Sequence, residues 1–345
     1  MTGSEIREKI LSAVAKNGGH LASSLGAVEL AMALRTEFDP DRDRIVWDVG
    51  HQAYAWKILT GRDAAFDTLR RLDGISGFPN PRESKADAAV AGHAGVALSV
   101  AEGLAAARDR KGTDEHVVAV VGDSAIANGT SFEALNNCVA ATKKVIVVLN
   151  DNDMSISKPA GSFARFLGRL TSGVRYNRVK NATKDTLAKL HLGVLYRVVH
   201  TLKGRVKSMV FRNVFFEQFG LHYIGPVDGH DVAALRAALV VAKEEKRSVI
   251  IHAVTKKGKG YAPAEKDPTG YHGIGPGKIG DQSSASTASR PRSWSDAFGE
   301  ALCAAAREDS RIVAITAAMK DGTGLDAFAA EFPDRFFDVG IAEGH

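Results

Sequence analysis

Polar residues follow two apolar runs of the chain, at the points where buried strands are expected to end. Gly122-Asp123-Ser124 comes directly after the β-branched run 117–121, and Asn150-Asp151-Asn152 comes after the next run, 145–149. Because parallel strands place their carboxyl ends at one edge of a sheet, Asp123 and Asn152 are expected to be neighbours. A carboxylate and an amide oxygen suit Mg²⁺, which can take its other ligands from a diphosphate. The pair therefore favours a magnesium and diphosphate site over two ordinary strand-end turns.

Elements of two kinds alternate around these residues. Short β-branched runs are typical of buried parallel strands, and Ala-, Leu- and Glu-rich stretches at helical spacing separate them. This alternation predicts an α/β fold, a parallel sheet flanked by helices. The expected strands are 45–49, 117–121, 145–149 and 249–254, and the expected helices are 28–34, 96–107, 132–141 and 232–243.

A polar, Ser-rich stretch at 281–292 reads as a linker between a first domain, 1–280, and a second, 293–345. After it we expect a helix over 295–307 with Ser295 as its N-cap, a strand at 312–315, a helix at 325–331 and a strand starting at 336. Two strands make a poor independent sheet. The second domain is therefore expected to be incomplete.

The composition is that of an ordinary soluble chain, with 345 residues, 45% hydrophobic and 25% charged. It has no apolar run of the roughly 18 to 20 residues that a membrane helix needs, and its first residues are polar. Cys138 and Cys303 form no CxxC pair, so neither a disulfide scaffold nor a cysteine zinc site is indicated. We expect a cytoplasmic protein without a membrane partner.

The net charge of +5 comes from one segment, residues 165–212, which holds twelve Lys or Arg and one acid, Asp185. No zinc-finger spacing or other readable nucleic-acid motif accompanies it. The segment is interpreted as a solvated or partner-facing helical surface, with an anion or acidic-partner site and a nucleic-acid site as the alternatives.

The residues at the two strand ends resemble the thiamine-diphosphate enzymes, whose shared motif is GDG with an Asn further along the chain. The sequence is more closely similar to the 1-deoxy-D-xylulose-5-phosphate synthase family. The similarity lies in seven blocks, at 19–30, 47–54, 57–62, 149–157, 223–231, 255–261 and 341–345. It implies a diphosphate-binding domain followed by the beginning of a pyrimidine-binding domain.

Carried over position by position, the resemblance implies a thiamine diphosphate and Mg²⁺ site. The metal ligands would be Asp123, Asn152 and the backbone carbonyl of Met154. The cofactor contacts would be His51, Gly92, His93, Ala94, Ser124, Ala125, Asn152, Met154, Tyr261 and Glu343.

Three of these positions are expected to act in catalysis. His20 and His51 resemble histidines that move protons of the cofactor or its substrate, a task that suits a neutral imidazole. Glu343 resembles the glutamate that hydrogen-bonds the pyrimidine ring and favours the tautomer that deprotonates the thiazolium carbon. By contrast, His222 and His230 flank the turn 225–229 without metal-ligand spacing and are interpreted as structural.

The family pattern is altered at three positions. Ser124 replaces the second glycine of GDG, Ala94 replaces a serine after His93, and Gly344 replaces a glutamine. Ser124 places a side chain where the backbone approaches the diphosphate, where it can hydrogen-bond a phosphate oxygen or crowd it. Weaker cofactor binding than in the family is expected.

The resemblance implies a transferase of isoprenoid biosynthesis that decarboxylates pyruvate and passes the two-carbon unit to an aldehyde such as glyceraldehyde 3-phosphate, an aldose phosphate. The leading hypothesis is the N-terminal subunit of a split enzyme. It needs a complementary subunit carrying the rest of the pyrimidine-binding domain, in a homodimer or heterotetramer. The alternatives are a non-catalytic paralogue that binds thiamine diphosphate and Mg²⁺, and a truncated, inactive homologue.

Overall fold

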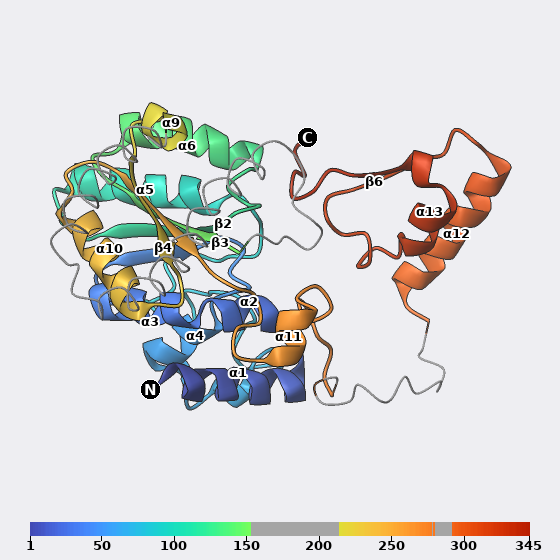
Figure 1. Ribbon diagram of the computed structural model, residues 1–345, viewed down its shortest axis with the longest axis horizontal. Helices are drawn as coiled ribbons and strands as arrows, with labels where there is room; N and C mark the ends of the chain where they lie inside the picture. Colours follow the sequence, from blue (N-terminus) through green and yellow to red (C-terminus); the bar gives the residue numbers. More distant parts are fainter. Residues whose placement is uncertain (153–213, 278, 280–291) are drawn as a thin grey trace, which may run out of the picture.

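The computed structural model describes residues 1–152, 214–277, 279 and 292–345 (Figure 1). The basic segment 165–212, Met154 and nearly all of the expected linker lie outside these ranges. Among the described residues, no helix has the length and apolar character needed to cross a bilayer.

A five-stranded sheet, all parallel, forms the centre of the first part of the chain, with the strand order β1-β2-β3-β5-β4. This confirms the predicted α/β fold with a parallel sheet. The strands are β1 (Arg44–Trp47), β2 (Val117–Gly122), β3 (Ile146–Asp151), β4 (His222–Asp228) and β5 (Val249–Val254).

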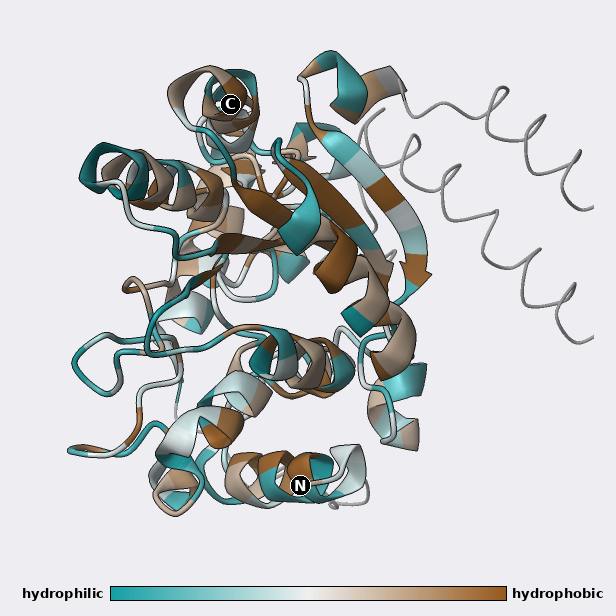
Figure 2. Cartoon of the chain, turned by 90° about the vertical axis from the view of Figure 1, so that its left-hand side faces the viewer, coloured by the Kyte–Doolittle hydropathy of each residue, from teal (hydrophilic) through white to brown (hydrophobic). Residues whose placement is uncertain are grey.

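Helices cover both faces of the sheet. Alternate residues of each strand point to opposite faces, so the sheet contributes to two apolar cores. One core packs against α1 (Gly3–Asn17), α2 (Leu21–Gly26), α3 (Val28–Glu37), α4 (Tyr54–Lys57) and α10 (Val232–Glu244). The other packs against α5 (Ala97–Lys111), α6 (Gly129–Ala141) and α9 (Val214–Gln218). Figure 2 shows the inner strands as the most hydrophobic elements of the chain.

Short helical turns complete this part of the chain. They are η1 (Ile58–Arg62), η2 (Phe66–Thr68) and α11 (Ala262–Lys266). A long irregular segment, residues 69–96, connects η2 to α5.

The edge strand β4 was not among the predicted strands. It contains Gly225-Pro226, and its register with β5 shifts between Ile224 and Val227. Proline cannot donate a ladder hydrogen bond and is therefore tolerated in edge strands, where one side of the backbone has no neighbour.

The C-terminal segment forms a small unit of its own around Cys303, Leu325 and Phe328. Its elements are α12 (Trp294–Glu308), β6 (Ala314–Thr316), α13 (Asp326–Glu331), η3 (Pro333–Arg335) and β7 (Phe336–Asp338). The predicted N-cap Ser295 is wrong, because Ser293 caps α12. Ser293 forms a reciprocal capping box with Asp296, which Ser295 cannot form because Phe298 is its third residue on.

Strands β6 and β7 form a two-stranded parallel sheet that leaves apolar side chains exposed. Ile315 and Phe337 are paired in register and are 67% and 49% exposed. Val313 beside them is 49% exposed. Soluble proteins normally cover a contiguous apolar face of this kind with another part of the chain or with a partner.

Candidate active site

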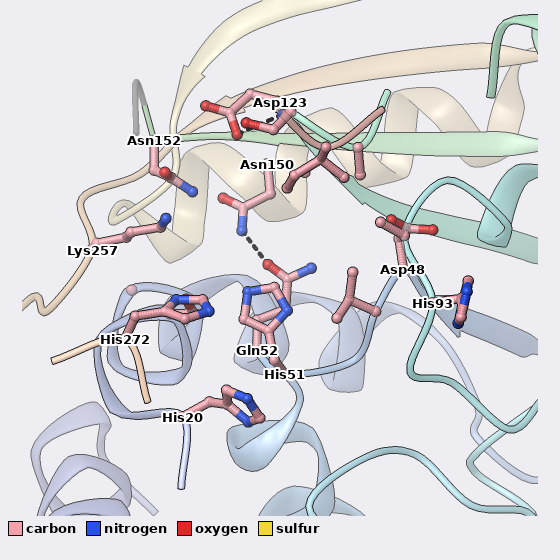
Figure 3. A pocket seen from close by; sticks show the side chains of 18 of the residues that line it. His20, Asp48, His51, Gln52, His93, Asp123, Asn150, Asn152, Lys257 and His272 are labelled. Carbon is pink, nitrogen blue, oxygen red and sulfur yellow. Dashed lines mark hydrogen bonds between the residues drawn. The ribbon is translucent and has the colours of Figure 1, made fainter. Parts of the chain in front are cut away.

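A pocket of about 310 Å³ opens at the carboxyl edge of the sheet (Figure 3). Its lining comes from α2, the ends of β2 and β3, the irregular segment before α5, the chain after β5, and the C-terminal segment. Open α/β sheets bind ligands at this edge, and the volume is within the range of small-molecule sites.

Ten of the twelve predicted site residues line this pocket. They are His20, His51, Gly92, His93, Ala94, Asp123, Ser124, Ala125, Asn152 and Glu343. Tyr261 does not line it; its ring packs edge-on against Tyr271, 5.8 Å between centroids. Met154 lies outside the described residues.

Asp123 and Asn152 are neighbours because β2 and β3 end in register, with Gly122 paired to Asn150. The backbone N–H of Asp123 donates to the Asn150 carbonyl at 3.3 Å. Burial raises the pKa of Asp123 to about 7, and the charge of Asp151 adds to that rise. The side-chain oxygen of Asn152 is buried without a hydrogen-bond partner among the described residues. Both oxygens are therefore placed to gain from a cation.

The donor set at this edge is small. Within the described ranges, no three His, Cys, Asp or Glu side chains gather closely enough to hold a metal by themselves. Asp123 and Asn152 together supply one carboxylate and one amide oxygen, which fits an ion such as Mg²⁺ that keeps phosphate and water ligands. A zinc-type site needs more nitrogen or sulfur ligands than this pair provides.

Lys257 lines the same end of the pocket, although it was not among the predicted site residues. It is 8% exposed, and burial lowers the pKa of its amine, while the charge of Asp123 opposes that shift. Its neighbour Thr255 donates to the side-chain oxygen of Asn150 at 2.6 Å, and Asn150 in turn donates to Gln52 at 2.8 Å. This buried polar layer forms the floor between the sheet and the histidines.

Three histidines face one another in the pocket: His20, His51 and His272. The ring centroids of His20 lie 5.7 Å from those of both others, and His51 and His272 are 5.2 Å apart. Burial, aided by Arg70, lowers the pKa of His20 to about 4. Burial, aided by Lys257, does the same for His272, and burial also lowers the pKa of His51. All three rings are neutral at pH 7 and can donate or accept protons.

His272 was also missed by the sequence analysis. It follows α11 and carries no local motif, so no pattern in the surrounding sequence indicates a pocket residue. Its Nδ1 lies 3.3 Å from the hydroxyl of Ser23, in α2. The buried Nδ1 atoms of His20 and His51 have no hydrogen-bond partner among the described residues.

Asp48, at the end of β1, holds the segment that carries Gly92, His93 and Ala94. Its two carboxylate oxygens accept from the backbone N–H groups of Gly95 and Ala97, each at 3.0 Å. Burial raises the pKa of Asp48, although these hydrogen bonds oppose the rise. The carboxylate thereby fixes the first turn of α5 beside the pocket.

Glu343 enters the pocket from the C-terminal segment, together with Ala317, Met319 and Ile341. The side-chain amide of Asn128 donates to its carboxylate at 3.3 Å. Asn128 is itself fixed, because its side-chain oxygen accepts from the Thr130 N–H as the N-cap of α6. The site thus combines two oxygens that can ligate a cation, a buried amine, three neutral imidazoles and a second carboxylate.

Comparison with known protein families agrees with the fold and the motifs. Residues 1–255 match the family described as 1-deoxy-D-xylulose-5-phosphate synthase, and residues 290–345 match the transketolase pyrimidine binding domain. Transketolases from Campylobacter jejuni and Leishmania mexicana share the fold, with TM-scores of 0.54 and 0.51 at 21% and 22% identity. Each alignment covers 79% of this chain and 40% or 39% of the transketolase.

Two curated relatives, both named 1-deoxy-D-xylulose-5-phosphate synthase, align along nearly all of this sequence. The protein of Clostridium kluyveri is 48% identical over 343 residues, which is 99% of this chain and 55% of the relative. The protein of Natranaerobius thermophilus is 46% identical over 343 residues, which is 99% of this chain and 54% of the relative. The chain spans about half the length of these relatives. It belongs to the 1-deoxy-D-xylulose-5-phosphate synthase family.

Proposed function

We propose that the pocket binds thiamine diphosphate together with Mg²⁺. The observation that carries the proposal is the buried group of Asp123, Asn152 and Lys257 at the carboxyl edge of the sheet. The buried carboxyl of Asp123 and the buried amide oxygen of Asn152 can ligate a cation, and the Lys257 amine in the same lining can donate to a phosphate, a combination that suits a metal-bound diphosphate. The carbonyl of Met154 is proposed as a further metal ligand.

The remaining lining divides into two groups. Gly92, His93, Ala94, Ser124 and Ala125 would contact the cofactor from the loop before α5 and the turn after β2. Glu343 would hydrogen-bond the pyrimidine ring from the other side, with Asn128 holding its carboxylate in place. Tyr261 stays a predicted contact, although its ring lies outside the pocket lining.

The reaction proposed for the complete site is transfer of the two-carbon unit of pyruvate to an aldehyde such as glyceraldehyde 3-phosphate. When bound, thiamine diphosphate supplies the nucleophilic carbon that such chemistry requires. His20 and His51 would move protons on the substrate side, because burial keeps both imidazoles neutral near pH 7. The names of the curated relatives support this reaction, which would place the protein in isoprenoid biosynthesis in the cytoplasm.

We also propose that the exposed apolar face of β6 and β7 receives the rest of a pyrimidine-binding domain from a complementary subunit. Ile315 and Phe337 form the centre of this face. The family match of residues 290–345 to a pyrimidine binding domain supports this occupant. A homodimer or heterotetramer would then be the working assembly.

Titration calorimetry with thiamine diphosphate and Mg²⁺ tests the binding site. The wild-type chain should bind the cofactor only when Mg²⁺ is present, and Asp123→Ala should abolish that binding. Unchanged affinity in Asp123→Ala would remove the proposed metal site. Binding without any transfer in reconstituted mixtures would favour the non-catalytic paralogue, for which Ser124, Ala94 and Gly344 are the supporting departures.

Reconstitution tests the complementary subunit. The chain is co-expressed with the part of the Clostridium kluyveri relative that lies beyond the aligned region, and the pair is assayed for association and for product formed from pyruvate and glyceraldehyde 3-phosphate. Ile315→Lys should prevent association while leaving cofactor binding intact. No association and no transfer with any such fragment would refute the split arrangement.

A further inference from the structure

A buried ionic cluster lies behind the pocket wall that carries Lys257. Arg7 of α1 donates to the carboxylate of Glu29 in α3 at 2.8 Å. The Nδ1 atom of His230, in the turn between β4 and α10, lies 3.0 Å from the same oxygen. The three side chains are 10% to 14% exposed. Burial would raise the pKa of Glu29, but the hydrogen bonds from His230 and Arg7 outweigh it and lower the pKa to about 2.

This cluster forms hydrogen bonds with the backbone that follows β5, residues 255–260. The N–H of Lys256 donates to Nε2 of His230 at 2.8 Å, and the carbonyl of Lys259 accepts from Nε of Arg7 at 2.7 Å. Between them, the N–H of Gly258 donates to the carbonyl of Ala22 at 2.7 Å. Three parts of the chain distant in sequence thus anchor one short segment.

The hydrogen bonds define the state of His230. Because Nε2 accepts from the Lys256 N–H, it carries no proton, so the proton of the neutral ring is on Nδ1 and is donated to Glu29. Glu29 therefore selects the tautomer that leaves Nε2 available as an acceptor. A buried carboxylate that orients an imidazole in this way is a common device behind ligand sites.

The segment 255–260 packs closely against α1 and α2. A Cβ on Gly26 of α2 would lie 2.9 Å from the carbonyl oxygen of Lys256. Gly260 has φ +85°, and a Cβ there would lie 2.7 Å from Cδ of Arg7. The backbone approaches α1 and α2 as closely as glycine permits.

Successive side chains of the segment point in opposite directions. Lys256 is exposed and pairs with Glu265, whereas Lys257 is buried in the pocket lining. The peptide held by His230 joins Thr255 to Lys256, so it lies one residue before the pocket lysine. A shift of this peptide would move the Lys257 amine relative to Asp123 and Asn152.

We propose that Arg7, Glu29 and His230 are positioning residues that fix the Lys257 amine for a diphosphate ligand, with His230 acting through the Lys256 N–H. This inference rests on the proposed binding of thiamine diphosphate. It assigns a ligand-directed role to His230, which was interpreted from the sequence as structural. None of the three residues lines the pocket.

Two substitutions at one position separate the two hydrogen bonds of His230. In His230→Gln, the side-chain oxygen can reach the place of Nε2 and still accept from Lys256. In His230→Asn, the amide takes the place of Nδ1 and can still donate to Glu29, but the acceptor for Lys256 is lost. Calorimetry with Mg²⁺ and thiamine diphosphate should show His230→Asn weakening binding about tenfold, with His230→Gln near wild type.

A double-mutant cycle with Lys257→Met distinguishes positioning of the Lys257 amine from a non-specific disturbance of the fold. Lys257→Met should weaken binding by itself, and adding His230→Asn should then cost little more, because the amine to be positioned is gone. The proposal would be overturned if His230→Gln and His230→Asn lost the same amount of cofactor affinity. It would also be overturned if the losses in binding free energy of His230→Asn and Lys257→Met were fully additive. Thermal melts of each variant check that the chain is folded.

In the same experiment, failure of this proposal and failure of the proposed function give different results. If the wild-type chain binds no thiamine diphosphate, the proposed function fails and inorganic diphosphate with Mg²⁺ becomes the probe for the Lys257 end of the pocket. If the wild type binds and Lys257→Met weakens binding while His230→Asn has no effect, the site stands and the positioning role is refuted.

Discussion

The side-chain amide of Asn128 donates to the carboxylate of Glu343 across 215 positions of sequence. The contact joins the N-terminus of α6 to the C-terminal segment and brings a carboxylate to the edge of the pocket. Asn128 has two tasks, because its oxygen caps α6 while its nitrogen holds Glu343.

Asn128→Asp should separate these two tasks. The aspartate keeps the capping oxygen but loses the donor and places a second carboxylate beside Glu343. Hydrogen exchange should speed up in residues 339–345 while the first turn of α6 stays protected. The control is Asn128→Ser, which also caps a helix but adds no charge; equal exchange in the two variants would rule out the repulsion.

Asp123→Asn should stabilise the metal-free protein while abolishing Mg²⁺-dependent cofactor binding. The pKa of Asp123 is about 7 in the fold, well above that of an unfolded aspartate, so ionisation costs stability increasingly from about pH 4 to pH 7 and fully above it. Removing the charge should therefore raise the melting temperature at pH 8 by about 2 °C or more.

The pH dependence of this effect provides its control. At pH 4 the folded chain holds a protonated Asp123 and the unfolded chain is only about half ionised at this residue, so the melting temperatures of the wild type and Asp123→Asn should nearly converge. In the wild type, affinity for Mg²⁺ should fall as the pH decreases below 7. A constant gain in stability from pH 4 to pH 8 would contradict the raised pKa.

The pocket histidines should make the protein acid-sensitive. Their pKa values are lowered in the fold, to about 4 for His20 and His272, so the unfolded chain takes up protons first as the pH falls through about 6.5. Stability is therefore lost between about pH 6.5 and pH 4, by up to about 2 kcal/mol per histidine at pH 5. His272→Asn should flatten this limb in urea unfolding curves, and an unchanged limb in this variant would contradict the lowered pKa.

Gly95→Ala should disturb the pocket through Asn128. Gly95 has φ +81°, and a Cβ there would lie 2.6 Å from Cγ of Asn128. The substitution should lower the melting temperature and release Glu343, detectable by faster exchange in residues 339–345. The matched control is Gly103→Ala in α5, where nothing lies within 4 Å and alanine favours the helix. Similar destabilisation by both would refute the steric argument.

Local patterns predicted much of the fold but less of the site. The strands β2, β3 and β5 follow from β-branched runs, because a strand buried on both faces needs apolar side chains throughout. Strand β4 was missed because Gly225-Pro226 reads as a turn, which only its edge position makes compatible with a strand. The cap at Ser293 required recognition of a reciprocal pair with Asp296.

The residues of the site that were missed share one physical cause. Lys257 and His272 reach the pocket through tertiary packing, and neither has a neighbouring residue in sequence that signals its burial. Conversely, Tyr261 belongs to a matching block, yet its ring packs on Tyr271 outside the lining. Asp123 and Asn152 were predictable because the carboxyl ends of neighbouring parallel strands always lie at the same edge of the sheet.

The 215-residue separation of Asn128 and Glu343 also has a consequence for synthesis of the protein. At about 5 to 20 residues per second, a ribosome needs roughly 10 to 40 s to add that length of chain. The sheet can be complete only in the last part of this interval, once β5 has been made, and this wall of the pocket has then still to emerge from the ribosome. A ligand therefore meets a nascent chain that is open on one side, and the pocket is completed only after that delay.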